Sequence, residues 1–405
     1  MFSASRWFPL AIVLSALLGW LAATVLGDVA WLAGFTDTLK NAYLTALKMI
    51  IAPLIFFSLI SGVFQLRESG GMGRLGAVTV SYYLLTSAIA VIVGLSIVFF
   101  IHPWTAYPPL TDIPPTDAVL IDAETGGIGH MLERVLLQML DNPFAALANL
   151  NILGILTSAL LIGLAGALVL PKTSALPGIV TDITAIIYRI AGWVISLLPI
   201  GLFAIAYQLS TNVDIGTLIA LGHFAGVVIG ATLFHGLVVL PLIAWWLTGR
   251  TPFQFLRAAY QPMFTAFVTS SSAATLPLSL SCAQERLGVS RPTASFVLPL
   301  GATVNMDGTA LFEGIAVVFL AYMFNVPLDA PTIVIVFLVA MLASAGAPGI
   351  PSGSMAGLQT VLLAVGIPLE AIGLVLLIER PLDTIRTAVN VEGDLIGSTV
   401  AERWG

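Results

Sequence analysis

The sequence predicts an all-α polytopic membrane protein, and two observations carry this prediction: a very apolar composition and many long apolar runs. Of the 405 residues, 58% are hydrophobic and only 9% are charged, whereas a soluble domain has roughly 25% charged residues. Most of the apolar runs approach or exceed the roughly 20 residues that a helix needs to cross a bilayer. They cover residues 8–26, 50–66, 78–101, 152–170, 190–207, 218–247 and 315–324. These runs predict six to eight spans, and the first run is interpreted as a helix rather than a cleaved leader.

Composition also narrows the classes of function. The single cysteine, Cys282, excludes an intrachain disulfide and argues against a metal site built from thiolates. The four histidines have no metal-ligand spacing, so neither a metal centre nor a cofactor is expected. The net charge of −6 includes no basic stripe, so nucleic acid is not an expected partner. A transport protein is therefore favoured over an enzyme.

The distribution of lysine and arginine predicts the orientation of the chain, because basic loops stay in the cytoplasm. The stretch 102–147 contains six acidic residues against Arg134 alone, and residues 211–217 contain no basic residue. Those two loops are expected outside the cell. The opposite, cytoplasmic side is marked by Arg67, Arg74, Lys172, Arg250 and Arg257.

Two apolar stretches are interrupted in a way that predicts re-entrant hairpins. Residues 263–282 separate two basic loops that should both be cytoplasmic, and the polar residues 269–272 divide this stretch into halves too short to span. Residues 331–365 are broken at 345–354 and lie between loops poor in lysine and arginine, which predicts a second hairpin entering from outside. Broken helices at membrane depth are typical of the midplane site of an inverted-repeat transporter.

The second hairpin has an alternative interpretation. Its glycines at four-residue spacing, Gly349, Gly353 and Gly357, could form a helix-packing face. Pro348 and Pro351 argue against one smooth helix in this segment, which favours the hairpin.

The last apolar segment carries a stripe of polar and charged residues. Steps of 4, 3, 1, 3 and 4 place on one helix face Glu379, Asp383, Arg386, Thr387, Asn390 and Asp394. A charge inside a membrane costs at least about 2.5 kcal/mol, so each one needs a partner or a function. The stripe could be a ladder of structural ion pairs, but three carboxylates around one arginine leave surplus negative charge. That surplus predicts bound cations.

A second polar cluster lies at residues 305–309, Asn-Met-Asp-Gly-Thr, where Gly308 favours a break in the helix. Carboxylate, amide, hydroxyl and carbonyl oxygens are the ligands that a small hard cation such as Na⁺ prefers. Together with Asn390 and Asp394 in another helix, this cluster predicts a cation site.

These motifs resemble those of the glutamate/aspartate transporters, also called dicarboxylate/amino acid:cation symporters or excitatory amino acid transporter-like proteins. The resemblance rests on Ser-Ser-Ser-Ala-Ala-Thr-Leu-Pro at 270–277, on residues 305–309, on the Gly/Pro tip of the second hairpin and on residues 383–394. It extends to residues 82–87 and 142–144, and so covers nearly the whole chain.

The resemblance implies a prokaryotic member in a bacterial or archaeal inner (plasma) membrane, with both termini in the cytoplasm. Eight transmembrane helices and two oppositely oriented re-entrant helical hairpins would form an inverted-repeat elevator transporter, assembled in the lipid bilayer as a homotrimer. The scaffold and trimerisation parts would cover residues 1–70 and 135–212, and the transport parts residues 75–101 and 215–400. Within the latter, hairpin one would cover residues 252–282 and hairpin two residues 330–365.

The implied function is secondary active import of L-aspartate or L-glutamate, with Na⁺ and H⁺ as transported coupling ions and no cofactor. Arg386 would pair with the substrate's side-chain carboxylate beside Thr309, Asp383 would bind its amino group, and Asn390 its main-chain carboxylate. Further substrate-binding residues implied by the resemblance are Ser271, Ser272, Ile350, Gly353 and Thr387. Relatives for neutral amino acids lack this arginine and those for C4-dicarboxylates lack the aspartate, so the pair favours acidic amino acids.

The resemblance also implies the coupling-ion residues. One sodium site would use Gly301, Asn305, Asn390 and Asp394. A second would use Tyr83, Thr86, Ser87, Asn305 and Asp307, and a third would be built mainly of backbone near Thr303 and Ser344. Glu313 stands where proton-coupled members carry a glutamate, and a carboxyl group in a low-dielectric interior favours its neutral, proton-carrying form. The alternative is that Glu313 only pairs with a nearby cation.

Several alternatives stay open. The sequence departs from the family pattern at two places. In the first hairpin, Ser270 stands where some prokaryotic members have an arginine. At the tip of the second hairpin, Ala345 and Ala347 depart from the pattern near the backbone-built sodium site. The protein could be coupled to protons alone, or could carry C4-dicarboxylates. An ion channel is a rival from another class, whereas a membrane enzyme is disfavoured because the serine run has no neighbouring histidine or lysine base.

Overall fold

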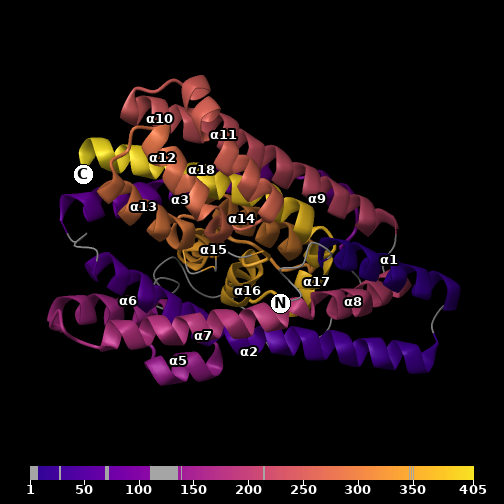
Figure 1. Cartoon of the computed structure of the whole chain (residues 1–405). Coiled ribbons are helices and arrows are strands. Elements are labelled where there is room, and N and C mark those ends of the chain that lie inside the picture. Colours follow the sequence, from indigo (N-terminus) through magenta and orange to yellow (C-terminus); the bar gives the residue numbers. More distant parts are fainter. Residues whose placement is uncertain are drawn as a thin grey trace.

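A computed structural model describes residues 8–26, 29–68, 73–109, 136–137, 139–212, 215–345, 347, 349 and 351–405. Every regular element in this part of the chain is a helix, and none is a strand (Figure 1). The all-α class predicted from composition is therefore confirmed for the described residues. Most of the acidic stretch 102–147, including Arg134, lies outside the described residues.

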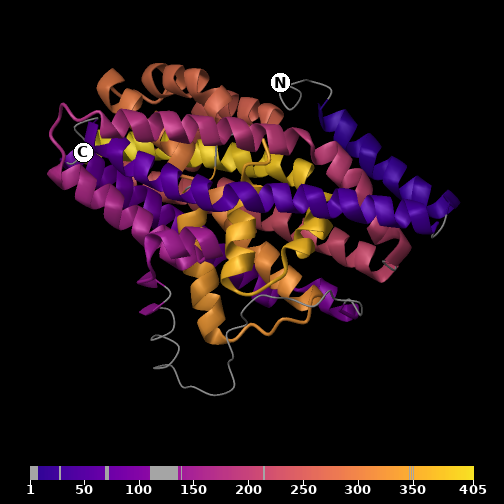
Figure 2. The same ribbon diagram turned by 90° about the horizontal axis from the view of Figure 1, so that it is seen from below.

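The first group of helices is organised around one very long helix. This helix, α2 (Ala30–Glu68), packs along α6 (Ile152–Val169), α7 (Leu176–Ser196) and α8 (Leu198–Asn212), and α8 in turn packs against α1 (Phe8–Leu26). Figures 1 and 2 show α2, α6 and α7 side by side. The short helix α5 (Pro143–Asn149) is capped by Asn142 and contacts α6.

The second group is centred on two buried helices, α14 (Asp307–Met323) and α18 (Glu379–Trp404). α14 is buried along almost its whole length, and α18 along its central turns. Around them pack α3 (Arg74–Phe100), α9 (Ile215–Phe234), the π-helical turn η3 (His235–Val239), α10 (Leu240–Thr248), α11 (Pro252–Thr269), α12 (Ser272–Glu285), α13 (Arg291–Val304), α15 (Ala330–Ser344) and α16 (Ser354–Ala364). The short elements are η2 (Pro103–Ala106), η4 (Leu369–Ala371) and α17 (Ile372–Leu376).

Three breaks in the second group bring helix ends together near its centre. The pair α11 and α12 turns at Ser270, which has a left-handed φ of 50°, and the Ser271 side chain caps α12 by accepting a hydrogen bond from Ala274 N. The pair α15 and α16 turns within residues 345–353, and α13 gives way to α14 at Asn305 and Met306. Backbone groups at these breaks are released from the regular hydrogen bonds of a continuous helix and can contact other elements inside the bundle.

Length and apolarity identify three helical segments in the described residues that could cross a membrane. They are Arg74–Ala106, Ile215–Thr248 and Arg291–Met323. The pair Leu176–Val194 and Leu198–Gln208, bent by 46°, is a fourth if it forms one span. The number of eight transmembrane helices, and the re-entrant placement of the two hairpins, remain predictions.

A small cavity lies where the two groups meet. It has a volume of about 50 Å³ and hydroxyl groups from both groups line it. Ser58, Thr184 and Tyr188 belong to the first group, and Thr303 and Ala345 belong to the second. Polar side chains of both groups therefore meet at this point of the boundary.

Helix α3 packs closely on α14 at Gly94. A Cβ atom at Gly94 would lie 2.8 Å from the carbonyl oxygen of Leu311, and backbone cannot move aside as a flexible side chain does. We expect Gly94→Ala to destabilise the protein by about 1–3 kcal/mol through overpacking, seen as a lower melting temperature in detergent. Gly226→Ala in α9 is the control, because a Cβ there meets nothing within 4 Å. Equal melting temperatures for the two variants would contradict the prediction.

Candidate functional site

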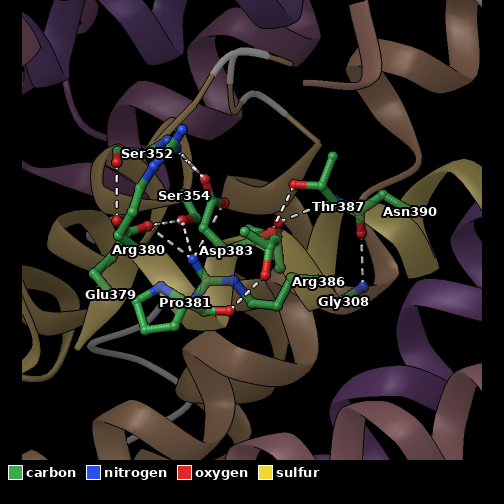
Figure 3. Close-up of polar contacts among 12 residues, drawn as sticks. Gly308, Ser352, Ser354, Glu379, Arg380, Pro381, Asp383, Arg386, Thr387 and Asn390 are labelled. Carbon is green, nitrogen blue, oxygen red and sulfur yellow. Dashed lines mark hydrogen bonds and ion pairs between the residues drawn. The ribbon is translucent and has the colours of Figure 1, made fainter. Parts of the chain in front are cut away.

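A buried arginine lies at the centre of the candidate site. Arg386 is only 1% exposed, and its Nη2 atom donates hydrogen bonds to Glu379 Oε1 at 2.9 Å and to Ser354 Oγ at 2.8 Å. Asp383 Oδ1 lies 3.3 Å from the same nitrogen (Figure 3). All three acidic and basic groups come from the first two turns of α18, as the stripe of residues in the sequence predicts.

Two nitrogens of this guanidinium have no hydrogen-bond acceptor among the described residues. Nε and Nη1 of Arg386 are both buried and unpaired. The guanidinium also lies over the ring of Phe312 on α14, 3.8 Å from its centroid. The free Nε and Nη1 donors lie on different edges of the guanidinium, so a carboxylate bound through two parallel hydrogen bonds would use one of them together with Nη2.

The tip of the second hairpin lies directly on this part of α18. Ser352 N donates to Asp383 Oδ2 at 2.9 Å, and Ser352 Oγ donates to Glu379 Oε2 at 2.8 Å. Ser354 Oγ lies 3.3 Å from Glu379 Oε1. Gly353, a predicted site residue, lies between the two serines, whereas Ile350 is outside the described residues.

The two hairpin tips also contact each other. Ser271 Oγ donates to the carbonyl oxygen of Gly349 at 2.8 Å, and Ala273 N donates to the same oxygen at 3.3 Å. Ser272 is the first residue of α12 and is buried. The predicted site residues of both hairpins therefore border one region in the interior of the second group.

The next turn of α18 connects this region to the break before α14. Asn390 Oδ1 accepts a hydrogen bond from Gly308 N at 2.8 Å (Figure 3). Asn390 Nδ2 lies 3.3 Å from Thr309 Oγ1. Thr387 Oγ1 instead donates to the carbonyl of Asp383, within its own helix. A Cβ at Gly308 would lie 2.7 Å from the Arg386 carbonyl oxygen, so the close approach of α14 to α18 requires glycine there.

A separate oxygen-rich cluster lies farther along α18. Asn305 Nδ2 donates to Asp394 Oδ1 at 3.1 Å, and Thr86 Oγ1 donates to Asn305 Oδ1 at 3.3 Å. Ser87 Oγ donates to Asp307 Oδ1 at 2.9 Å. These five side chains come from α3, α14, α18 and the break between α13 and α14, and each is at most 4% exposed. Such a set of buried oxygens can hold a small cation.

Glycine and tyrosine complete this cluster. A Cβ at Gly301 would collide with Asp394 Oδ1 and would lie 2.5 Å from the hydroxyl oxygen of Tyr83. The Tyr83 hydroxyl donates to the carbonyl oxygen of Val297 at 2.9 Å. The residues predicted for the first two ion sites are thus neighbours in the structure.

The two residues predicted for the third ion site, Thr303 and Ser344, form no side-chain hydrogen bond to each other, unlike the residues of the first two sites. Thr303 Oγ1 donates to the carbonyl of Leu300 and Ser344 Oγ to that of Met341, each within its own helix. Ser344 is fully buried, and Thr303 borders the small cavity between the two groups of helices.

Glu313 lies in the interior of α14 against the second hairpin. Its side chain is fully buried, and neither carboxyl oxygen has a hydrogen-bond partner among the described residues. A Cβ at Gly357 on α16 would collide with Glu313 Oε1. The carboxyl group of Glu313 therefore touches α16, directly beyond the tip.

The structure corrects one part of the sequence interpretation. Three carboxylates were expected around one arginine, but Asp394 lies with Asn305 instead. A second guanidinium is also present, because Arg380 Nη1 lies 3.4 Å from Asp383 Oδ2. Arg386 is therefore in contact with two acidic groups, one of which also contacts Arg380.

Two buried titratable residues were not identified from sequence. Glu392 on α18 is fully buried, has no hydrogen-bond partner among the described residues, and lies against Gly236 of the π-helical turn. His235 in the same turn is fully buried, with Nε2 3.8 Å from Asp307 Oδ2. A charged residue inside an apolar segment indicates a functional role, and this signal could have identified Glu392 from the sequence. Glu392, however, is not on the helix face that carries the predicted stripe.

Comparison with known proteins agrees with this arrangement. The family model described as "Sodium:dicarboxylate symporter family" matches residues 7–404. An excitatory amino acid transporter of Caenorhabditis elegans is 32% identical over 88% of this chain and 79% of its own length. The human neutral amino acid transporter B(0) is 32% identical over 89% of this chain and 72% of its own length. An excitatory amino acid transporter of Onchocerca volvulus is 31% identical over 88% of this chain.

The family model matches almost the entire chain, so membership of this family, which the motifs suggested, is confirmed. Members of the family are transporters and not enzymes, and Na⁺ is a transported coupling ion in them rather than a cofactor. The chain belongs to the Sodium:dicarboxylate symporter family.

Proposed function

We propose that this symporter imports L-aspartate or L-glutamate together with Na⁺ and a proton. The observation that carries the choice of substrate is the buried Arg386 guanidinium with its unpaired Nε and Nη1 atoms. The names of similar proteins include transporters of excitatory and of neutral amino acids at the same identity, so they do not select a substrate. A buried guanidinium with two such donors disfavours a neutral side chain, because those donors would lack an acceptor in a dry site.

The other groups of the substrate are assigned from the surroundings of Arg386. Asp383 is the proposed partner of the amino group, since it is a buried carboxylate one helical turn from Arg386 and in contact with it. Asn390, Thr309 and Thr387 are proposed to bind the main-chain carboxylate on the adjacent turn. Ser271, Ser272, Gly353 and the backbone of Ile350 would complete the site from the two tips.

The sodium sites are proposed at the oxygen cluster on the far side of Asn390. Asn305, Asn390, Asp394 and the backbone of Gly301 would form one site. A second site would use Tyr83, Thr86, Ser87, Asn305 and Asp307, and a third the backbone around Thr303 and Ser344. Asp307 Oδ2 is buried and has no hydrogen-bond partner among the described residues, which supports a cation there.

Glu313 is the proposed proton carrier. Its unpaired, fully buried carboxyl group stands against α16, so its protonation state can influence closure of the second hairpin. A neutral carboxyl group is far less costly in this position than a carboxylate. Carrying one proton also offsets the negative charge of the substrate, which favours uptake driven by the membrane potential.

The movement is proposed to be an elevator motion within a homotrimer. The helices α1, α2 and α5 to α8 would be the scaffold and trimerisation part, and α3 with α9 to α18 the transport part. We also propose a bacterial or archaeal inner membrane location, with both termini in the cytoplasm.

The role of Arg386 is tested by uptake of radiolabelled aspartate and glutamate into proteoliposomes. Arg386→Ala should lower uptake by about 100-fold, because the substrate carboxylate loses a bidentate charged partner. Asp383→Asn should weaken binding of amino acids far more than of C4-dicarboxylates, which have no ammonium group. Normal acidic amino acid uptake by Arg386→Ala, in protein that elutes as wild type, would contradict the assignment.

Sodium coupling is tested by measuring aspartate affinity while Na⁺ is replaced by choline. Affinity should rise steeply with Na⁺, and by linkage aspartate should tighten Na⁺ binding equally. Gly301→Ala should shift the Na⁺ dependence to about tenfold higher concentration, because the new Cβ displaces Asp394 and Tyr83. Gly222→Ala, where a Cβ meets nothing within 4 Å, is the control. Binding that is indifferent to Na⁺ in the wild type would favour coupling to protons alone.

Proton coupling is tested with Glu313→Gln in proteoliposomes under an imposed pH gradient. The variant should transport substrate without carrying protons, and its uptake should lose the pH dependence of the wild type. Glu392→Gln is the matched control, since Glu392 is also a fully buried carboxyl group without a hydrogen-bond partner among the described residues. If Glu392→Gln lost proton transport and Glu313→Gln kept it, the carrier would be Glu392.

A further inference from the structure

The exposed face of α11 is an apolar stripe that contains one basic residue. Steps of 4, 3, 4 and 3 along the helix place on this face Phe253, Arg257, Tyr260, Phe264 and Phe267. The four aromatic side chains are between 42% and 74% exposed. Large exposed apolar surfaces mark contacts with other proteins or with membranes. In a chain that belongs to a family of membrane transporters, this stripe is a surface suited to lipid chains.

Two arginines lie beside the tyrosine of this stripe. Arg286, the residue at which α12 ends, has its guanidinium over the ring of Tyr260, 5.6 Å from the centroid. Arg257 precedes Tyr260 by one helical turn on the same face of α11. Both arginines are exposed, and neither forms a hydrogen bond or an ion pair with another described residue. One guanidinium from each helix of the pair α11 and α12 is thus available to an anion.

The surface around these two arginines is also basic. Helix α18 packs against α10 and α12 there (Figure 1). Residues 73–80, 245–260, 280–292 and 398–405 form this end of the second group, and their six arginines against two glutamates give a formal charge of +4. None of the six forms an ion pair with a carboxylate in the described part of the chain, so the protein leaves this positive charge unneutralised. The arginines are Arg74, Arg250, Arg257, Arg286, Arg291 and Arg403, and the glutamates are Glu285 and Glu402.

Both parts of an anionic phospholipid fit this surface. Its phosphate is an acceptor suited to guanidinium groups, and its acyl chains match the apolar stripe. Tyrosine and tryptophan are enriched at the level of lipid headgroups, and on the neighbouring helix α10 Trp245 and Trp246 are 52% and 81% exposed. This basic end is also the one expected in the cytoplasm, where anionic lipids attract arginine. A soluble anion would use the arginines alone and leave the stripe without a partner.

We propose that the pair α11 and α12 binds one anionic phospholipid, with the phosphate between Arg257 and Arg286 and the acyl chains along the stripe of α11. The proposal requires that the chain lies in a membrane, and it does not depend on which substrate is carried. A phosphate held by both arginines connects the beginning of α11 with the end of α12. The lipid therefore stabilises the pair of helices whose turn, at Ser270 and Ser271, borders the candidate substrate site.

Lipid binding is measured by native mass spectrometry of the detergent-solubilised protein, titrated with phosphatidylglycerol or with phosphatidylcholine. Arg257→Gln and Arg286→Gln should each weaken binding of phosphatidylglycerol about fivefold, because each removes one charge that attracts the phosphate. Arg257→Lys keeps the charge and should stay within about twofold of the wild type. Arg189→Gln is the matched control, since Arg189 is an exposed arginine of α7 in the first group of helices.

A second measurement tests the connection between the two helices. In nanodiscs that contain phosphatidylglycerol, backbone hydrogen exchange of residues 252–260 and 280–286 should be slower than in nanodiscs of phosphatidylcholine alone. The double variant Arg257→Gln/Arg286→Gln should show no such difference between the two lipids, because its phosphate site is lost.

Three results would overturn the lipid site. They are equal binding of phosphatidylglycerol by the wild type and both glutamine variants, equal binding of phosphatidylcholine and phosphatidylglycerol by the wild type, and displacement of the lipid by an excess of inorganic phosphate, which would indicate a site for the free anion. Absence of aspartate and glutamate transport by the wild type would overturn the proposed function instead, and the lipid titration would still decide the site on α11 and α12.

Discussion

The rest of the site depends on one constraint, a guanidinium placed where water does not reach. Arg386 is 1% exposed, so its charge must be matched by groups that the protein or a ligand brings to it. Glu379 and Asp383 match it from its own helix, Ser354 from the second hairpin, and the ring of Phe312 from α14. Three elements are thereby drawn to one point, which makes that point sensitive to any ligand that competes for the guanidinium.

The broken helices follow from the same requirement for polar groups in an apolar interior. The breaks at Ser270, at Asn305 and within residues 345–353 expose backbone donors and acceptors that a continuous helix would use internally. These groups find partners in one another, as in the hydrogen bonds from Ser271 and Ala273 to the Gly349 carbonyl. The polar centre of the bundle is therefore built largely from helix ends.

The buried acidic residues of the described part of the chain lie on α14 and α18, at several positions along these two helices. Asp307 and Asp394 are engaged by hydroxyl and amide groups, whereas Glu313 and Glu392 have no hydrogen-bond partner among the described residues. A buried carboxylate without such partners favours a bound cation or its own neutral, protonated form. In the proposed function, substrate, sodium and proton would all bind along two neighbouring helices, which would provide a direct physical route for coupling their binding.

The sequence by itself determined the features that depend on local spacing or on composition. These are the all-α class, the turn at the serine run 270–272 and the contact of Asp383 with Arg386, three residues apart on one helix. Tertiary structure alone decided which distant groups meet: Asp394 with Asn305 rather than Arg386, Glu392 against Gly236, and the hydroxyls of Ser352 and Ser354 on Glu379. Helical periodicity shows which face of a helix a residue occupies, but the partner on another helix depends on how the helices pack.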